Sequence, residues 1–142
     1  MPELGKDSMR MLLMEPETLL RRTVALTART LGVGNIQEAG NAALAERMLK
    51  EKAFHGAVIA IDTGATDTVC DLGLLDQVRN GMTASHSAIP IAVLAERCDA
   101  ALLQELRRRD ITRIILKPFR ARLLLDVFTE FSTADVKVKN WN

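Results

Sequence analysis

Hydrophobic positions along the chain follow two alternating patterns. Short, mostly apolar runs at 10–14, 35–39, 57–61, 89–94 and 113–116 indicate strands, and the most apolar of them are typical of strands buried on both faces. After each run, apolar residues recur three or four positions apart, which is typical of one face of a helix. The helical positions are Leu20/Val24/Thr27/Leu31, Leu44/Ala45/Met48/Leu49, Leu74/Leu75/Val78, Leu102/Leu103/Leu106 and Leu124/Val127/Phe128/Phe131.

Prolines and glycines divide these segments. Pro16 suits the first turn of a helix, where its missing N–H is not needed, and Pro90 stands at the start of a strand. Gly32 and Gly34 end the first helix, and Gly81 ends the third. Five strands alternating with five helices predict an α/β fold: a doubly wound, five-stranded parallel sheet in the order 2-1-3-4-5.

In this order, the carboxyl ends of the strands meet at one edge of the sheet. Glu15 follows the first strand, Asp62 the third and Lys117 the fifth. Because open α/β sheets bind their ligands at this edge, we expect two carboxylates and an ammonium group to cluster there.

Length and charge limit the classes of protein to which this chain can belong. The 142 residues suit one domain at 9–131, with a disordered leader at 1–8 and a polar tail at 132–142. Lys and Arg number 19 against 18 Asp and Glu, so bulk charge implies no nucleic-acid partner. No apolar run is long enough for a membrane helix, and Cys70 and Cys98 lack metal or redox spacing. We therefore expect a cytoplasmic protein with free thiols, with His55 and His86 at its surface.

Three short motifs carry a family resemblance: Leu12-Leu13-Met14-Glu15, Leu19-Leu20-Arg21-Arg22 and Lys117-Pro118-Phe119. With the element order, they make the chain from Met9 to Phe131 resemble the receiver domain of two-component response regulators. The resemblance implies a flavodoxin-like receiver fold, in which an aspartate after the third strand takes a phosphoryl group from a histidine kinase. It also implies magnesium held by acids after the first strand, a phosphate-binding lysine after the fifth, and a switching hydroxyl after the fourth.

Several positions of this chain depart from that pattern. The resemblance assigns phosphate to Lys117, which the family joins to its proline by a cis bond, and magnesium to Glu15 and Asp62. Magnesium binding is weakened because Pro16 offers no oxygen where the family has a second acid, although Glu17 is an alternative ligand. The two switch positions hold Ala95 in place of Ser or Thr, and Ile114 in place of an aromatic residue.

The phosphoacceptor position has several candidates. Asp62 is the nearest acid, but counting from the start of its strand selects Ile61, and counting back from the third helix selects Thr63. Asp62 could equally start a turn, Glu15 could cap the first helix, and Lys117 could bind loop carbonyls. We interpret the chain as a degenerate receiver.

Residues 60–69 suggest a different class of protein. The run Ala-Ile-Asp-Thr-Gly-Ala-Thr-Asp-Thr-Val looks like the active-site signature of retroviral-type aspartic proteases, with Asp62 as the catalytic acid. Those proteases are almost entirely β, whereas this chain has amphipathic helices on both sides of the motif.

The resulting hypothesis is a non-enzymatic, single-domain receiver in phosphorelay signal transduction that works by protein–protein interaction in a bacterial cytoplasm. Its partner would be a histidine kinase, a phosphotransferase or a regulator, and its fourth and fifth helices could also form a homodimer. Arginines 107–109 and Arg113 either line that surface or complement a helix dipole. The alternative within the class is a conventional receiver phosphorylated at Asp62.

Overall fold

The computed structural model describes residues 9–61, 71–111 and 113–141, the last part (133–141) as helical backbone. The predicted leader, Asp62, Thr63, Cys70 and most of the protease-like motif lie outside these ranges.

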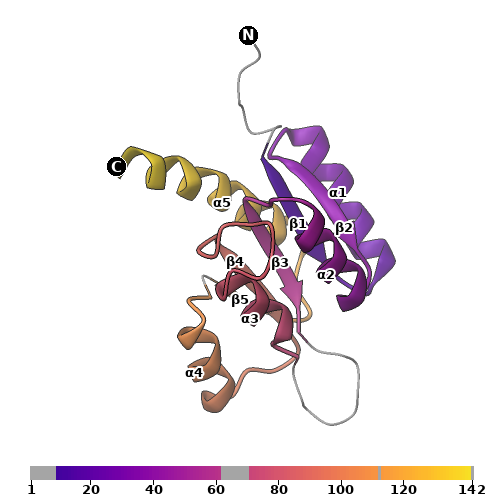
Figure 1. Cartoon of the computed structure of the whole chain (residues 1–142). Coiled ribbons are helices and arrows are strands. Elements are labelled where there is room, and N and C mark those ends of the chain that lie inside the picture. Colours follow the sequence, from indigo (N-terminus) through magenta and orange to yellow (C-terminus); the bar gives the residue numbers. More distant parts are fainter. Residues whose placement is uncertain (1–8, 62–70, 112, 142) are drawn as a thin grey trace.

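Five strands and five helices alternate along the described parts of the chain (Figure 1). The strands form one parallel sheet in the order β2-β1-β3-β4-β5, which confirms the predicted fold class. The elements are β1 (Arg10–Met14), α1 (Thr18–Leu31), β2 (Asn35–Ala39), α2 (Ala42–Glu51), β3 (Gly56–Ala60), α3 (Gly73–Arg79), β4 (Ile91–Ala95), α4 (Ala100–Arg108), β5 (Arg113–Leu116) and α5 (Ala121–Trp141). Helix α5 thus continues past Phe131 into the segment predicted as a tail.

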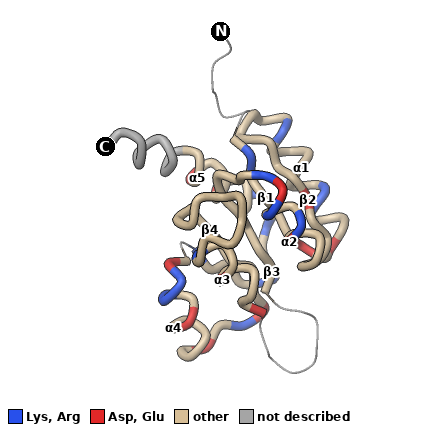
Figure 2. Tube along the Cα trace, in the orientation of Figure 1, with Lys and Arg blue, Asp and Glu red and all other residues tan. Residues whose placement is uncertain are grey.

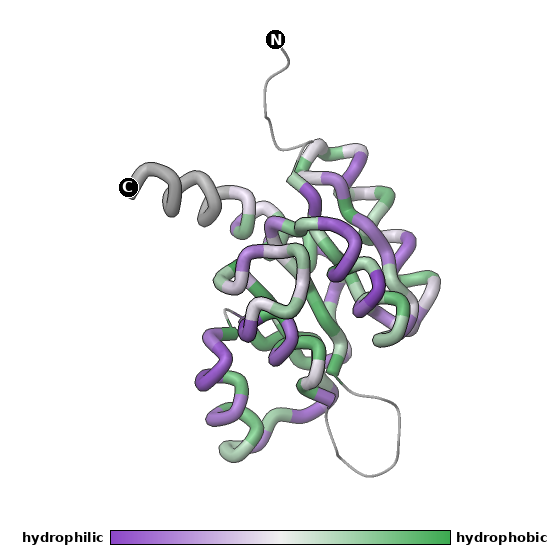
Figure 3. The backbone as a smooth tube through the Cα atoms, viewed as in Figure 1, coloured by the Kyte–Doolittle hydropathy of each residue, from purple (hydrophilic) through white to green (hydrophobic). Residues whose placement is uncertain are grey.

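The helices cover both faces of the sheet. Helix α1 packs against α5, and α2 packs against α3. Every residue of β3 and β4 is buried, as expected for central strands of a parallel sheet. Figure 3 shows this apolar centre: the central strands are mostly green, whereas green and purple alternate along the helices. The predicted inner face of α5 is confirmed, since Leu124, Val127, Phe128 and Phe131 are all buried.

Helix ends follow the expected chemistry, with one correction. Gly32 takes a left-handed conformation (φ 70°) at the end of α1, and the side chains of Asn41 and Asp99 cap α2 and α4. Leu31 was predicted on the buried face of α1 but is 62% exposed. It is the last residue of the helix, where the chain turns away at Gly32, and Ala28 takes the inner position.

In the arginine cluster at 107–109 and 113, one residue forms ion pairs that connect two helices. Arg109 pairs with Asp76 of α3 (Nε–Oδ1 2.6 Å) and with Glu105 (Nη1–Oε1 3.0 Å), and these bonds raise its pKa. Arg107 and Arg108 at the end of α4 are exposed (Figure 2). His55 differs from its expected place at the surface, because it is half-buried and its Nδ1 accepts the N–H of Arg10 (2.9 Å). Arg109 therefore links α4 to α3, and a partner surface at Arg107 and Arg108 stays a prediction.

Candidate functional site

The carboxyl ends of β1, β3, β4 and β5 lie side by side at one edge of the sheet. Parallel pairing aligns Met14 with Ile59, Ala60 with Leu94, and Ala95 with Leu116. The residues that directly follow these strands therefore meet at that edge, as the sequence predicts.

Glu15 follows β1 and is almost completely buried, with 1% of its surface exposed. Its Oε2 accepts the N–H of Glu17 at 2.7 Å, just before α1 begins. Its backbone N–H donates to the carbonyl of Ala39 in β2 (3.0 Å), and its own carbonyl accepts Nη1 of Arg21 (2.7 Å). The carboxylate is therefore held in one orientation by the start of α1.

Lys117 forms an ion pair with Glu15 at the centre of the site. Its Nζ lies 2.9 Å from Oε1 of Glu15, and its side chain is 25% exposed. The angle does not meet hydrogen-bond geometry, so Oε1 has the ion pair but no hydrogen bond within the described part of the chain. The sequence prediction that these two residues lie at the same edge of the sheet is confirmed. The alternative expectation was that Lys117 binds loop carbonyls, but its observed partner is the Glu15 side chain.

The pair spans the tips of two intervening strands. The backbones of β1 and β5 are three strand spacings apart, about 14 Å, and both side chains extend to close that distance. The last residues of the two intervening strands, β3 and β4, are Ala60 and Ala95, and both are buried.

The register at the end of β3 places Ile61 directly after the strand. Its N–H donates to the carbonyl of Leu94 (3.0 Å), its carbonyl accepts the N–H of Asp71 (3.0 Å), and only 1% of its surface is exposed. An isoleucine therefore occupies the first position after β3, one of the three candidates for the acceptor. Asp62, the candidate phosphoacceptor and metal ligand, lies outside the described residues.

The two switch positions lie on β4 and β5. Ala95 is fully buried and its carbonyl accepts the N–H of Lys117 (2.9 Å), while Ile114 is half-buried. Neither side chain carries a hydrogen-bonding group. The Lys117–Pro118 peptide bond is cis, as the resemblance implies.

The described residues do not fit a magnesium ion. Both oxygens of Glu15 are engaged, one by the Glu17 N–H and the other by the Lys117 ammonium, which repels a cation. Pro16 supplies no ligand, and Glu17 is exposed at the start of α1. No group of three or more His, Cys, Asp or Glu that could hold a metal occurs among the described residues, which exclude Asp62.

The space around Lys117 is also unfavourable to an anion. Lys117 lies in an open depression lined by Glu17, Glu96, Pro118 and Phe119. Acidic side chains beside the ammonium, together with Glu15 beneath it, neutralise the charge that would attract phosphate.

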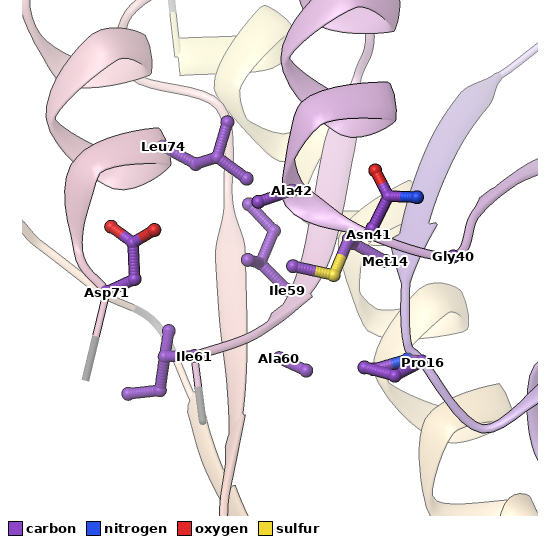
Figure 4. A pocket seen from close by; sticks show the side chains of 10 residues that line it. All are labelled: Met14, Pro16, Gly40, Asn41, Ala42, Ile59, Ala60, Ile61, Asp71 and Leu74. Carbon is purple, nitrogen blue, oxygen red and sulfur yellow. The ribbon is translucent and has the colours of Figure 1, made fainter. Parts of the chain in front are cut away.

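A second cavity of about 290 Å³ opens between the ends of β1 and β3 and the starts of α2 and α3 (Figure 4). Its lining includes Met14, Ile59 and Leu74, and also Pro16 and Ile61 from the positions discussed above. Two positions that the resemblance connects with metal and phosphate chemistry are therefore apolar walls here.

Arg21 is a site residue that sequence reasoning missed. It bonds the Glu15 carbonyl and the Glu38 carboxylate (Nε–Oε1 3.1 Å), and its guanidinium lies against Gly40. Arg21 belonged to a motif that supported the resemblance, but its position at the end of the first turn of α1 gave no sign of these contacts. A half-buried arginine near a strand end could have been suspected from its place on the edge of the apolar face of α1.

Response-regulator receiver domains are among the solved structures with the same fold. Chemotaxis protein CheY4 of Vibrio cholerae is 17% identical, with a TM-score of 0.70 over 87% of this chain and 98% of that one. The HemR receiver domain of Leptospira biflexa is also 17% identical, with a TM-score of 0.73 over 88% and 94% of the two chains. The Francisella response regulator 1452 receiver domain is 12% identical, with a TM-score of 0.73 over 90% and 99%.

The chain therefore has the receiver fold, and the resemblance drawn from its short motifs is confirmed at the level of fold. No protein-family model matches the sequence, and no curated relative matches it. None of the helices in the described residues is long and apolar enough to cross a bilayer.

Proposed function

We propose that this chain is a degenerate receiver domain, which acts in signal transduction by binding a partner protein and does not receive a phosphoryl group. The observation that carries the proposal is the buried Glu15–Lys117 ion pair, in which the phosphate-binding lysine of the resemblance already has a carboxylate partner.

The neighbouring residues support the same conclusion. Phosphoryl transfer depends on positioning and on neutralising charge by a metal ion and cations. Here Ile61 follows β3, Ala95 has no hydroxyl group, and Glu15 cannot accept a metal ion without losing Lys117. Each component that would capture and read a phosphoryl group is missing or occupied among the described residues.

The proposed docking surface is formed by α4, β5 and the first turns of α5. Leu116 of β5 is 49% exposed, and Arg107 and Arg108 are exposed at the end of α4. Arg113 is paired with Glu130 across β5 and α5 (Nη1–Oε2 3.0 Å). An exposed leucine and exposed arginines on one surface, of which Arg108 is also paired with Glu105 (Nη1–Oε2 3.5 Å), suit a partner with an apolar patch and acidic side chains, such as a histidine kinase, a phosphotransferase, a regulator or a second copy of the chain.

The first experiment is incubation with acetyl phosphate and Mg²⁺, followed by intact mass measurement of the wild type and of Asp62→Ala. We expect no stable gain of a phosphoryl group in either protein. A gain in the wild type that disappears in Asp62→Ala would instead establish the conventional receiver.

The docking surface is tested by charge reversal. Arg107→Glu with Arg108→Glu should weaken self-association in sedimentation velocity, or binding to an identified partner. Arg47→Glu on the exposed side of α2 is the matched control. Arg109 is left unchanged because its reversal would also break the link to Asp76. Equal binding by the double variant and the wild type would exclude this surface.

A further inference from the structure

We infer that the cavity between β1, β3, α2 and α3 is a binding site for a small molecule with an apolar body and a cationic amine. This inference is independent of the proposed function, because it concerns a different face of the same strand ends.

The floor of the cavity is apolar and belongs to the core. Met14, Ile59 and Leu74 line it, and all three are buried. The neighbouring β1 residues Leu12 and Leu13 are 0% exposed, whereas Met14 keeps 6%. Met14 and Leu74 each keep 6% of their surface exposed, as expected if an opening connects this part of the core with solvent. Figure 4 shows these side chains converging from three different elements.

The walls and the rim give the cavity its shape. Ala60, Ile61 and Ala42 form walls, and the exposed Pro16, Asn41 and Asp71 stand at the rim. A volume of about 290 Å³ is near the lower end of the usual range for ligand sites. The topological switch point between β1 and β3 is also where open α/β sheets bind ligands. An apolar floor offers water few partners, so an apolar group is favoured there.

The charge of the ligand follows from the rim. Among the described residues that line the cavity, Asp71 alone is charged, and it favours a cation. Its Oδ1 accepts the N–H of Gly73 (2.9 Å), which leaves Oδ2 for a ligand. Asn41 uses its Oδ1 to accept the N–H of Leu44 (2.8 Å), so its amide NH₂ is the group still available. A ring or short alkyl chain on the floor with an ammonium at Asp71 matches both ends.

The test uses the whole chain with ¹³C-labelled Met, Ile and Leu methyl groups and three phenyl probes that differ in their polar end: phenethylamine, 2-phenylethanol and 3-phenylpropanoate. We expect phenethylamine to shift the methyl signals of Met14, Ile59, Ile61 and Leu74, and to bind about tenfold more tightly than 3-phenylpropanoate. No shift with any probe at millimolar concentration, or tighter binding of the anion, would overturn the assignment.

Three variants separate the parts of the site. Ala42→Leu fills the cavity and should weaken binding of phenethylamine about tenfold or more, whereas Ala43→Leu, exposed on the same helix, should leave binding unchanged. Asp71→Asn keeps an oxygen for the Gly73 N–H and should remove the preference for phenethylamine over 2-phenylethanol. Unchanged affinity in Ala42→Leu, or an unchanged preference in Asp71→Asn, would contradict the inference.

Discussion

Lys117 and Glu15 come from opposite ends of the chain and form an ion pair 2.9 Å long across the tips of two intervening strands. The two partners are buried to different extents, 25% against 1% exposed, so they should respond differently to substitution. The lysine can be hydrated if its partner is lost, whereas the carboxylate cannot.

The first prediction concerns this asymmetry. Lys117→Met leaves the buried carboxylate without a cation and should lower the free energy of unfolding by about 3 kcal/mol. Glu15→Gln keeps an acceptor for the Glu17 N–H and should cost only about 1 kcal/mol. The double variant should be close in stability to Glu15→Gln alone. Urea unfolding of the four proteins measures the cycle, and equal costs for the two single variants would show that the pair is not buried in the way described.

The second prediction concerns Arg79, at the end of α3. It links this helix to the segment before β4 and to the segment before β5. Its guanidinium donates to the carbonyls of Arg109 (2.6 Å), Ser87 (2.8 Å), Ile89 (2.8 Å) and Asp110 (3.0 Å). Burial lowers the pKa of Arg79, which the nearby Asp110 carboxylate partly opposes. Lysine cannot reach all four carbonyls, so Arg79→Lys should lower the free energy of unfolding by about 2 kcal/mol.

The control for that substitution is Arg47→Lys, on the exposed side of α2. It should change the stability by less than about 0.5 kcal/mol. Thermal or urea unfolding compares the two, and equal effects would mean that the four carbonyl contacts contribute little.

Apolar periodicity was sufficient to predict the fold because a parallel sheet buries both of its faces. The runs at β3 and β4 and the four inner positions of α5 leave few alternatives to a doubly wound arrangement. The same topology brought Glu15 and Lys117 to one edge. Contact between them was not predictable, since it depends on how two long side chains from strands that are not neighbours are oriented, which periodicity does not determine.

Features that change when the register of a strand shifts by one residue also could not be predicted from the sequence. Whether Ile61 or its neighbours directly follow β3 is decided by pairing with Leu94, and periodicity alone cannot place a strand end to one residue. Arg21, Pro16 and Ile61 acquire their roles only when the ends of three elements meet. Local patterns therefore predicted the sheet, and tertiary contacts determined the site.

The third prediction is a pH dependence at the surface of α2. Lys50 lowers the pKa of Glu46 below its ordinary 4.5, through a side-chain hydrogen bond (3.1 Å) and the charge of the ammonium, and Gln77 contributes less. A lowered folded-state pKa means that the pair stabilises the protein above pH 4.5, and that this contribution is lost as the pH falls through the folded-state value.

Lys50→Met should therefore return the pKa of Glu46 towards 4.5, which an NMR titration of the side-chain carboxyl carbon would measure. Lys52→Met on the same helix end is the control, because Lys52 contacts Gln37 and not Glu46. If the pKa of Glu46 stays low in Lys50→Met, the hydrogen bond to Lys50 is not its cause.

The fourth prediction concerns Gly56, where β3 begins against the inner face of α5. A Cβ at this position would lie 2.8 Å from Cδ2 of Phe131 and 3.1 Å from Sδ of Met11, and both of these side chains are buried. Gly56→Ala should therefore lower the free energy of unfolding by about 1–3 kcal/mol through overpacking. Gly73→Ala, at the start of α3, is the matched substitution: among the described residues, its Cβ would meet the exposed side chain of Asp71 at 3.1 Å, which can move. Because alanine also favours helix over glycine by up to about 1 kcal/mol, that variant should be as stable as the wild type or more stable. Urea unfolding of the two variants would compare them directly, and a Gly56→Ala protein as stable as Gly73→Ala would show that Phe131 is not packed against β3.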